Sequence, residues 1–306
     1  RLFKQFIKNN FMTNDEITII IVAYKCDDII LKNLSNLNNF KVIIIDNFKD
    51  SFLKNKICSF TNVKYEKQDI NLGEGSGAQI GLKLVNTKYT LYLNPDTFIN
   101  EFNILKLKDI FLRYSNIGLL TPLHLNQKNE YIANYFIHPF NRKIKRNSFE
   151  KKIFNLLNDV KPSGDISPRC IWGAPLFFNT KLIRKIGFFD TNFFLFFEDV
   201  DLCDRVIKNN LKIILTNDAF CIHLNQDYSS KSIKYLFYTS SNFIFSQMYY
   251  FNKNNRSISH FYLRGFEYFL NSLIYLFTLN KIKFFQNIFR IYGIFKFILF
   301  KISKTI

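Results

Sequence analysis

Four carboxylates stand close together in a chain that is otherwise rich in positive charge. The segment FFEDVDLCDR (196–205) contains Glu198, Asp199, Asp201 and Asp204, whereas the whole chain has a formal net charge of +18. Acidic residues near the start of a helix are stabilised by the helix dipole. The aromatic run directly before them, FFDTNFFLFF, predicts a dry wall, against which a carboxylate pKa rises toward that of a working base. The cluster is therefore either the polar start of a helix or a site that uses negative charge.

A second candidate is the tripeptide Asn94-Pro95-Asp96, which follows a run that favours a strand, TKYTLYL. Proline fixes its own φ and pushes the residue before it into an extended conformation. Asp96 is thus expected at a rigid strand end, where a divalent cation could bridge it to phosphates. An ordinary turn containing Asp fits the same residues. His223 follows a later strand-like run and could be a further metal ligand, although a lone His is usually structural.

A glycine-rich stretch, NLGEGSGAQIGLKLV (71–85), leads into an amphipathic pattern typical of a helix. Backbone N–H groups in such a loop can approach phosphate closely. Gly73, Gly75 and Gly77 alternate, but Ala78 stands where a dinucleotide-binding GxGxxG fingerprint needs glycine, and no GKS or GKT follows. A phosphate-binding loop and a plain turn both remain compatible with this stretch.

Strand-like and helix-like patterns alternate along the first part of the chain. This alternation predicts βαβ units and an α/β fold with a mainly parallel sheet flanked by helices. Ligands bind at the carboxyl ends of strands in such sheets, where Ala23, Tyr24, Asp46 and Asn47 are expected. The region 123–168 is polar, basic and broken by Pro and Gly, which indicates an insertion. The expected strands are 17–23, 41–46, 62–68, 87–96, 117–122, 169–179 and 211–224, and the expected helices include 28–38, 180–187 and 198–209.

The character of the chain changes near residue 231, which divides it into a predicted catalytic domain, 13–230, and a helical extension, 231–306. The extension has eleven Lys or Arg against one acid, Glu267, and many aromatic residues. From residue 257 onward the longest uncharged run, Tyr268 to Asn280, has 13 residues, fewer than the roughly 20 needed to span a bilayer. The pattern favours in-plane amphipathic helices on an anionic membrane surface over a packed C-terminal subdomain.

The cysteines and the N-terminal residues bear on the compartment. Five cysteines are scattered without a CxxC pair, which is typical of a reducing compartment. No secretory signal is evident at the start, and residues 1–11 precede Met12 as an apparent upstream extension. We expect a cytoplasmic protein held peripherally on the inner face of the cytoplasmic membrane.

Taken in order, these segments resemble the motifs of family 2 GT-A glycosyltransferases. The matching segments are VAYK, IIIDN, NLGEGSG, LNPDT, IWGAPLF, GFFDTNFFLFFEDVDLCDR and His223, and the resemblance covers about residues 16–250. It is strongest to bacterial rhamnosyltransferase-like members that build surface polysaccharide. It implies a GT-A fold and inverting transfer of rhamnose or another hexose from a dTDP- or UDP-linked donor to a lipid-linked or surface glycan acceptor.

The resemblance also implies a role for each matching residue. Asp199 would be the catalytic base, with Glu198 beside it orienting the acceptor. Asp96 would hold Mg²⁺ or Mn²⁺ on the diphosphate, and His223 would complete that site. Asn94 replaces the first Asp of the metal motif, and Glu74 departs from the usual glycine-rich loop. The donor-binding set is Ala23, Tyr24, Asp46, Asn47, Gly73, Gly77, Asn94 and Asp96, and the sugar and acceptor pocket is Trp172, Gly173 and Ala174.

Two other functions are weighed against this one. A sugar nucleotidyltransferase needs a Gly- and Lys/Arg-rich triphosphate loop after the first strand, where VAYKCDD stands instead. A non-enzymatic basic protein that binds RNA or membrane accounts for the charge but leaves Asp96 and Asp199 without a role. Aromatic RNA-binding motifs are not evident, so no nucleic acid partner is expected.

Overall fold

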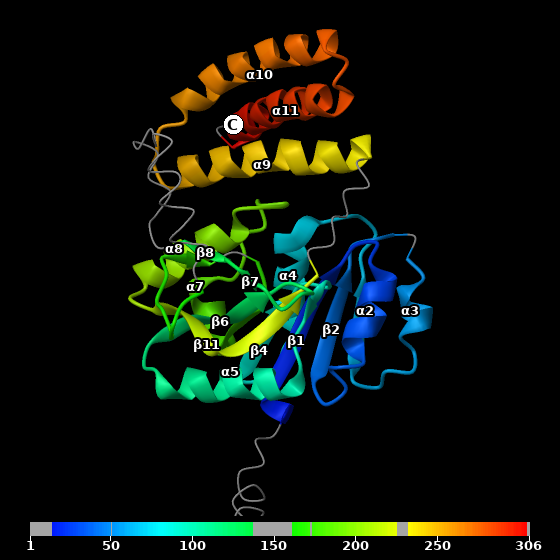
Figure 1. The fold of residues 1–306 in the computed structure, drawn as a ribbon, viewed down its shortest axis with the longest axis vertical. Coiled ribbons are helices and arrows are strands. Elements are labelled where there is room, and N and C mark those ends of the chain that lie inside the picture. The colour runs from blue at the N-terminus through cyan, green and yellow to red at the C-terminus, as the bar shows by residue number, and fades with distance from the viewer. Residues whose placement is uncertain (1–13, 50, 137–160, 172, 225–231, 305–306) are drawn as a thin grey trace, which may run out of the picture. The chain divides into compact units, whose positions relative to one another are not determined.

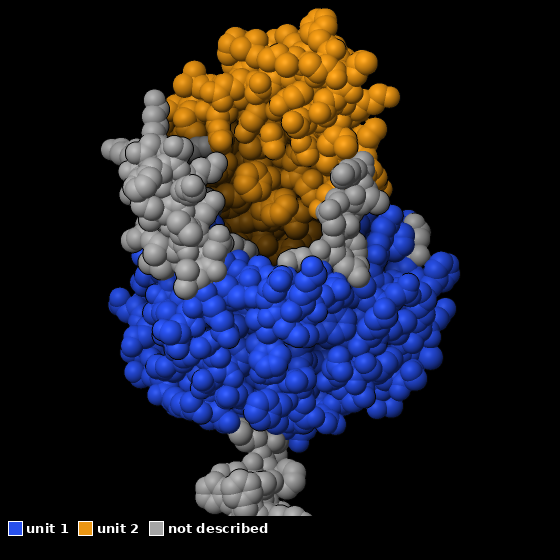
Figure 2. All heavy atoms as spheres, viewed as in Figure 1, with its two compact units in different colours: residues 1–72, 77–188, 202–225 blue, residues 73–76, 189–201, 226–306 orange. Residues whose placement is uncertain are grey.

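The computed structural model describes residues 14–49, 51–136, 161–171, 173–224 and 232–304. The chain forms two compact units: unit 1 comprises residues 1–72, 77–188 and 202–225, and unit 2 comprises residues 73–76, 189–201 and 226–306 (Figure 2). The boundary predicted at 230 lies outside the described residues. Residues 189–201 group with the C-terminal helices in unit 2.

Unit 1 is built on a mixed sheet with the strand order β3-β2-β1-β4-β10-β6-β11-β5, and β7 pairs with β6 (Figure 1). Parallel pairing joins β1 to β2 and β4, β2 to β3, and β6 to β11, whereas β10 runs antiparallel between β4 and β6. The predicted α/β fold is therefore confirmed. The strands are β1 (Ile17–Ala23), β2 (Lys41–Asp46), β3 (Val63–Lys67), β4 (Tyr89–Leu93), β5 (Thr97–Phe98), β6 (Ile117–Leu125), β7 (Tyr131–Ile132), β10 (Leu176–Asn179) and β11 (Lys212–His223), with β8 (Tyr135–Phe136) and β9 (Cys170–Ile171) paired separately.

Both faces of the central strands are covered, which explains their uninterrupted apolar runs. Every residue of β1 is buried. Ile19 and Ile21 belong to the core cluster that includes residues of α2 and α5. Ile20 and Val22 face α4 at Gly81 and Gly77, where a larger side chain would clash with them. The helices contributing to unit 1 are the 3₁₀ turn η1 (Asn14–Glu16), α2 (Asp27–Leu34), α3 (Leu53–Lys56), α4 (Gly73–Leu84), α5 (Glu101–Arg113), α7 (Thr180–Ile186) and α8 (Glu198–Lys208), of which α4 and α8 begin with residues of unit 2.

The predicted insertion at 123–168 begins later than expected. Strand β6 continues past Pro122 to Leu125, and β7 and β8 also fall within this region. The register between β6 and β11 shifts at Thr216/Phe220, opposite Pro122 and Leu123. A bulge of this kind accommodates a proline, which cannot donate a ladder hydrogen bond, so the strand does not end there.

Unit 2 contains the helices α9 (Ile233–Lys253), α10 (Ser259–Phe277) and α11 (Lys281–Ser303). Helix α11 packs against both α9 and α10 (Figure 1). Ser232 and Asn280 cap α9 and α11 by accepting hydrogen bonds from backbone N–H groups in their first turns. None of the helices in the described ranges combines the length and hydropathy needed to cross a bilayer.

We predict that Gly293→Ala lowers the free energy of unfolding by about 1–3 kcal/mol, the usual cost of overpacking. A Cβ at this position on α11 would overlap the backbone oxygen of Ser241 on α9. Gly265→Ala on α10 is the matched control, because its Cβ would meet only the end of the Ile294 side chain, at 3.1 Å. Urea unfolding of both variants measures the difference. Equal stability of the two variants would show that α9 and α11 do not cross closely at Gly293.

Candidate active site

The turn after β4 is held from two directions by hydrogen bonds to its backbone. Asn33, fully buried on α2, donates through Nδ2 to the carbonyl oxygens of Pro95 (3.2 Å) and Thr97 (2.8 Å). The backbone N–H of Leu224 donates to the carbonyl oxygen of Asp96 at 2.9 Å. The Asp96 backbone is therefore fixed at the carboxyl end of β4, as the sequence predicts, by an Asn that the sequence did not single out.

Asp96 and His223, both predicted metal ligands, lie together in unit 1. His223 Nε2 is 3.3 Å from Asp96 Oδ1, and both side chains are partly accessible. The pairing of β5 with β11 places His223 opposite Thr97, the residue after Asp96. Carboxylate and imidazole groups are common ligands of divalent cations. No cluster of three or more His, Cys, Asp or Glu suited to a metal occurs in the described part of the chain.

A second histidine, which the sequence analysis missed, lies behind this pair. His124 on β6 is buried, and its ring packs edge-on against His223 with centroids 5.8 Å apart. Burial, and then the charge on His223, lower the pKa of His124 to about 3. Its Nε2 has no hydrogen-bond partner among the described residues. His124 is therefore neutral and fixes one side of the His223 ring; a single His in an apolar strand gives no signal of this role.

The ends of β1 and β2 form a small aromatic platform. The Tyr24 and Phe48 rings meet edge-on at 5.9 Å, and Lys25 Nζ lies 4.7 Å from the Phe48 centroid. Asp46 is only 1% exposed, and its carboxylate accepts hydrogen bonds from Tyr65 Oη (2.7 Å) and Phe48 N (3.0 Å). Burial, and then the bond to Asp46, raise the pKa of Tyr65. Asp46 thus positions the platform. Tyr24 is exposed, whereas Ala23, Asp46 and Asn47, the other predicted donor-site residues at these strand ends, are buried.

The other predicted donor-site residues have local structural roles as well. Asn47 donates its backbone N–H to the carbonyl oxygen of Ala23 at 2.9 Å, which ties β2 to the end of β1. Gly77 lies within α4, where a Cβ would come within 2.8 Å of Val22 Cγ1. Gly73 begins α4 with φ +80°, and a Cβ there would overlap the carbonyl oxygen of Phe194. Close packing accounts for both glycines.

The predicted sugar and acceptor segment is only partly described. Gly173 has φ +74°, a left-handed backbone conformation that glycine adopts most readily, and Ala174 is fully buried. Trp172 lies outside the described residues. The role implied for this segment stays a prediction.

In unit 2 an unusual backbone precedes the acidic cluster. Phe196 and Phe197 have φ of +70° and +67°, and α8 begins at the next residue, Glu198. Bulky residues adopt this left-handed region only when their surroundings enforce it. The enforcing contacts come from α9: Phe196 packs on Phe243 at 5.6 Å between centroids, and Phe197 packs on Phe243 at 5.7 Å and on Tyr250 at 5.6 Å.

Two of the four clustered carboxylates have cationic partners. Lys253 Nζ, at the end of α9, lies 2.7 Å from both Asp201 Oδ1 and Asp190 Oδ2. Burial alone would raise the pKa of Asp190, but hydrogen bonds from Lys253 and its other neighbours lower it to about 2. Asp204 lies 3.5 Å from an Arg169 nitrogen. These acids anchor α8, and no pattern along the chain indicated Lys253 as the partner.

The other two carboxylates, Glu198 and Asp199, form the candidate acid–base pair. Glu198 is 9% exposed, and its Oε2 has no hydrogen-bond partner among the described residues. Burial, and then the negative charge of Asp199, raise the pKa of Glu198 well above its ordinary value, with a smaller contribution from Glu74. Asp199 accepts a hydrogen bond from the Val200 N–H at 2.8 Å. A protonated Glu198 can donate a hydrogen bond beside the Asp199 carboxylate.

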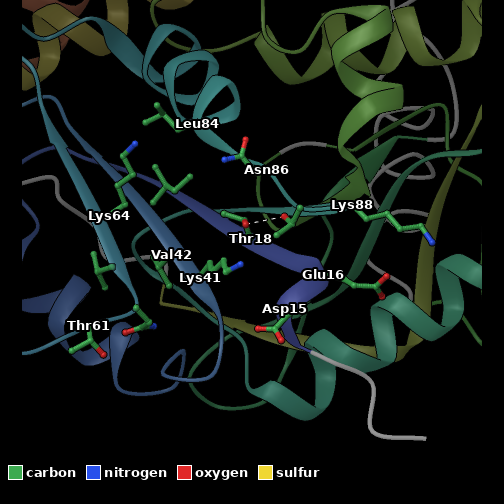
Figure 3. A pocket seen from close by; sticks show the side chains of 14 residues that line it. Asp15, Glu16, Thr18, Lys41, Val42, Thr61, Lys64, Leu84, Asn86 and Lys88 are labelled. Atoms are coloured by element: carbon green, nitrogen blue, oxygen red, sulfur yellow. Dashed lines mark hydrogen bonds between the residues drawn. The ribbon is translucent and has the colours of Figure 1, made fainter.

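A cavity of about 500 Å³ lies elsewhere, at the amino ends of β1, β2 and β3 (Figure 3). None of the predicted site residues lines it. Thr18 and Thr87 hydrogen-bond to each other at 2.8 Å at this cavity. Ligands of open α/β sheets bind at the opposite, carboxyl ends of the strands, so we place the candidate site there.

We predict that Glu198→Gln stabilises the protein increasingly as the pH rises. A raised folded-state pKa means that folded wild type binds more protons than the unfolded chain, so its stability falls as the pH rises from about 4.5 through the folded pKa. Glutamine removes this loss, which amounts to about 1.4 kcal/mol for each pH unit between the unfolded and the folded pKa. Urea unfolding across this pH range measures the effect, with the exposed Glu267→Gln as control. A gain that does not change with pH would contradict the raised pKa.

Comparisons with known proteins find similarity to glycosyltransferases. Residues 18–163 match the family model described as Glycosyl transferase family 2. The chain is 25% identical over 204 residues to the low-salt glycan biosynthesis hexosyltransferase Agl10 of Haloferax volcanii, covering 65% of this chain and 64% of that protein. It is 24% identical over 265 residues to the rhamnosyltransferase WbbL of Escherichia coli, covering 79% of this chain and 97% of that protein.

Two solved structures share the fold at low identity. One is GalNAc-T7 with UDP, GalNAc and Mn²⁺, with a TM-score of 0.53, 10% identity, and coverage of 76% of this chain and 47% of that one. The other is the mannosyltransferase PcManGT from Pyrobaculum calidifontis with GDP-Man and Mn²⁺, with a TM-score of 0.52, 11% identity, and coverage of 76% and 63%. The family match and the curated relatives confirm the predicted resemblance to family 2 glycosyltransferases, and the solved structures share the GT-A fold of this chain.

Proposed function

We propose that the protein transfers a hexosyl group, such as rhamnose, from a nucleoside-diphosphate sugar to a hydroxyl of a glycan or lipid-linked glycan, with inversion at the anomeric carbon. The observation that carries the proposal is the Asp96–His223 pair at the carboxyl end of β4, with 3.3 Å between the two side chains. The names of the curated relatives, a hexosyltransferase and a rhamnosyltransferase, support the sugar class.

On the donor side, the platform of Tyr24, Lys25 and Phe48 suits a uracil or thymine base and a nearby phosphate. Aromatic faces stack on bases, and a lysine supplies positive charge. Asp96 and His223 would hold Mg²⁺ or Mn²⁺, as two structural neighbours contain Mn²⁺ with a nucleotide or nucleotide sugar. A divalent cation there would neutralise the charge that develops on the diphosphate leaving group. The resemblance also implies donor-binding roles for Gly73, Gly77 and Asn94, and we include these roles in the proposal.

On the acceptor side, Asp199 would take the proton from the attacking hydroxyl, and protonated Glu198 would orient that hydroxyl by donating a hydrogen bond. A single base and a single in-line displacement invert the anomeric centre without a covalent intermediate. The buried, aromatic setting of Glu198 favours this division of roles, because it keeps Glu198 neutral beside an ionised neighbour. Trp172, Gly173 and Ala174 would shape the sugar pocket, and the reaction would take place at the cytoplasmic face of an anionic membrane.

The proposal is tested by a panel of nucleotide sugars. We expect dTDP- or UDP-linked sugars to raise the melting temperature in the presence of Mg²⁺ or Mn²⁺, and to be hydrolysed slowly without acceptor. Salt-sensitive RNA binding with no response to any nucleotide sugar would instead support a non-enzymatic basic protein.

Asp96→Ala is predicted to weaken donor binding chiefly when the divalent cation is present. The carboxylate acts through the metal, so with EDTA the variant and wild type should bind the donor about equally weakly. Calorimetric titration of the nucleotide sugar with and without EDTA measures this, and Asp109→Ala on α5 is the control. The same loss under both conditions would mean that Asp96 has a structural role.

Asp199→Asn should reduce the transfer rate by at least about 10²-fold, the low end of general-base effects. The amide keeps the shape of the side chain but cannot accept the proton, so the melting temperature and nucleotide binding should stay near those of wild type. Single-turnover transfer to a glycan acceptor measures the rate, with the surface variant Asp218→Asn beside it. An undiminished rate would remove the base role from Asp199.

A further inference from the structure

Helix α10 exposes an apolar stripe to its surroundings. Of its 19 residues, only Phe261 and Ser272 are buried. Leu263, Phe266 and Phe277 are 72%, 63% and 83% exposed. Spacings of three and four residues put the exposed apolar residues on one side of the helix. We call Leu263, Phe266, Leu270, Leu273, Ile274 and Phe277 the α10 stripe.

The side of α10 that packs on α11 carries small and amphipathic residues. The centroid of the Tyr268 ring lies 5.4 Å from Arg290 Cζ, and that of the Tyr275 ring lies 5.3 Å from Lys283 Nζ. Both cations belong to α11. Gly265 packs near Ile294. A surface helix in water places its apolar side inward and its polar side outward. Helix α10 instead leaves most of its apolar residues exposed, so the stripe offers a surface to an apolar partner.

The stripe ends at a turn where apolar and cationic side chains alternate. Phe277 is followed by Leu279, which is 81% exposed, and then by the exposed Lys281 and Lys283. Residues 231–306 hold eleven Lys or Arg against one acid, Glu267. An apolar stripe beside a cationic turn matches the chemistry of an anionic lipid surface, with acyl chains below and phosphates above.

We propose that the α10 stripe docks in the plane of an anionic lipid bilayer, with Lys281 and Lys283 against the lipid phosphates. A second copy of the chain fits less well, because pairing two stripes would bring two strongly cationic surfaces together. A membrane-spanning arrangement is disfavoured, since no helix in the described ranges is long and apolar enough. This inference gives the membrane partner of the proposed function a defined surface, and it is tested without any sugar donor.

The first test uses flotation of the full-length protein with phosphatidylcholine vesicles, with and without phosphatidylglycerol. We expect binding only when phosphatidylglycerol is present, and we expect the triple variant Leu263→Glu, Phe266→Glu, Leu270→Glu to lose it at least tenfold. The matched control carries the same change at three comparably exposed residues of unit 1, Phe52, Phe102 and Leu112. All six positions are exposed, so far-UV circular dichroism should be unchanged. Equal binding by both triple variants would overturn the proposal.

The second test changes charge alone. Lys281→Gln with Lys283→Gln should weaken binding to phosphatidylglycerol vesicles by roughly 30-fold, since two cations near the surface are lost. Lys54→Gln with Lys83→Gln, two exposed lysines of unit 1, should leave it nearly unchanged. Glu267→Gln, which removes the acid beside the stripe, should strengthen it.

Other outcomes would identify a different partner for the stripe, or would distinguish failure of this inference from failure of the proposed reaction. If the wild-type protein is a dimer without vesicles and the α10 triple variant is a monomer, the stripe binds a second copy of the chain and not the membrane. Asp199→Asn should bind vesicles like wild type, because the stripe does not include the acid–base pair. Vesicle binding without transfer by any nucleotide sugar would refute the proposed function alone, and transfer without vesicle binding would refute this inference alone.

Discussion

The start of helix α8 depends on two consecutive phenylalanines held in a left-handed backbone conformation. Each such residue costs on the order of 1–3 kcal/mol. The ring contacts of Phe196 and Phe197 with Phe243 and Tyr250 contribute about 0.5–1.5 kcal/mol per pair beyond burial, which offsets much of that cost. Helix α9 therefore supports the candidate acid–base pair, because its rings hold the two residues that precede Glu198.

The four clustered carboxylates divide by their neighbours. Asp201 and Asp204 lie near Lys253 and Arg169, so their charges are compensated and anchor α8. Glu198 is buried beside Asp199, and desolvation with like charge favours its neutral form. One short segment thus contains anchoring acids and a pair suited to proton transfer. The helix-start explanation and the catalytic explanation apply to different members of the cluster.

The sequence predicted best where a pattern extends over many residues. The β-branched runs of β1 and β2, buried on both faces, gave the strands and their bounds, and the proline of Asn94-Pro95-Asp96 gave the rigid strand end. Single polar residues were missed, because Asn33, His124 and Lys253 act through partners 62, 99 and 52 positions away in sequence. The glycines of α4 left a phosphate-binding loop and a plain turn both open, because the strand and aromatic segment that they contact cannot be inferred from the glycines themselves.

The same limit applies to the C-terminal helices, where α9 and α10 have similar apolar content but opposite surroundings. Phe245 and Met248 of α9 are buried, and Lys296 of α11 lies over the Phe245 ring at 4.8 Å. In α10 most apolar side chains are exposed, and only Phe261 and Ser272 are buried. Composition alone does not distinguish a helix with buried apolar residues, such as α9, from one with exposed apolar residues, such as α10. The packing of the two helices does. Because α11 lies between α10 and α9, lipid on the stripe would be one helix removed from the residues that support Phe196 and Phe197. A membrane contact on α10 is thus compatible with an intact acid–base pair.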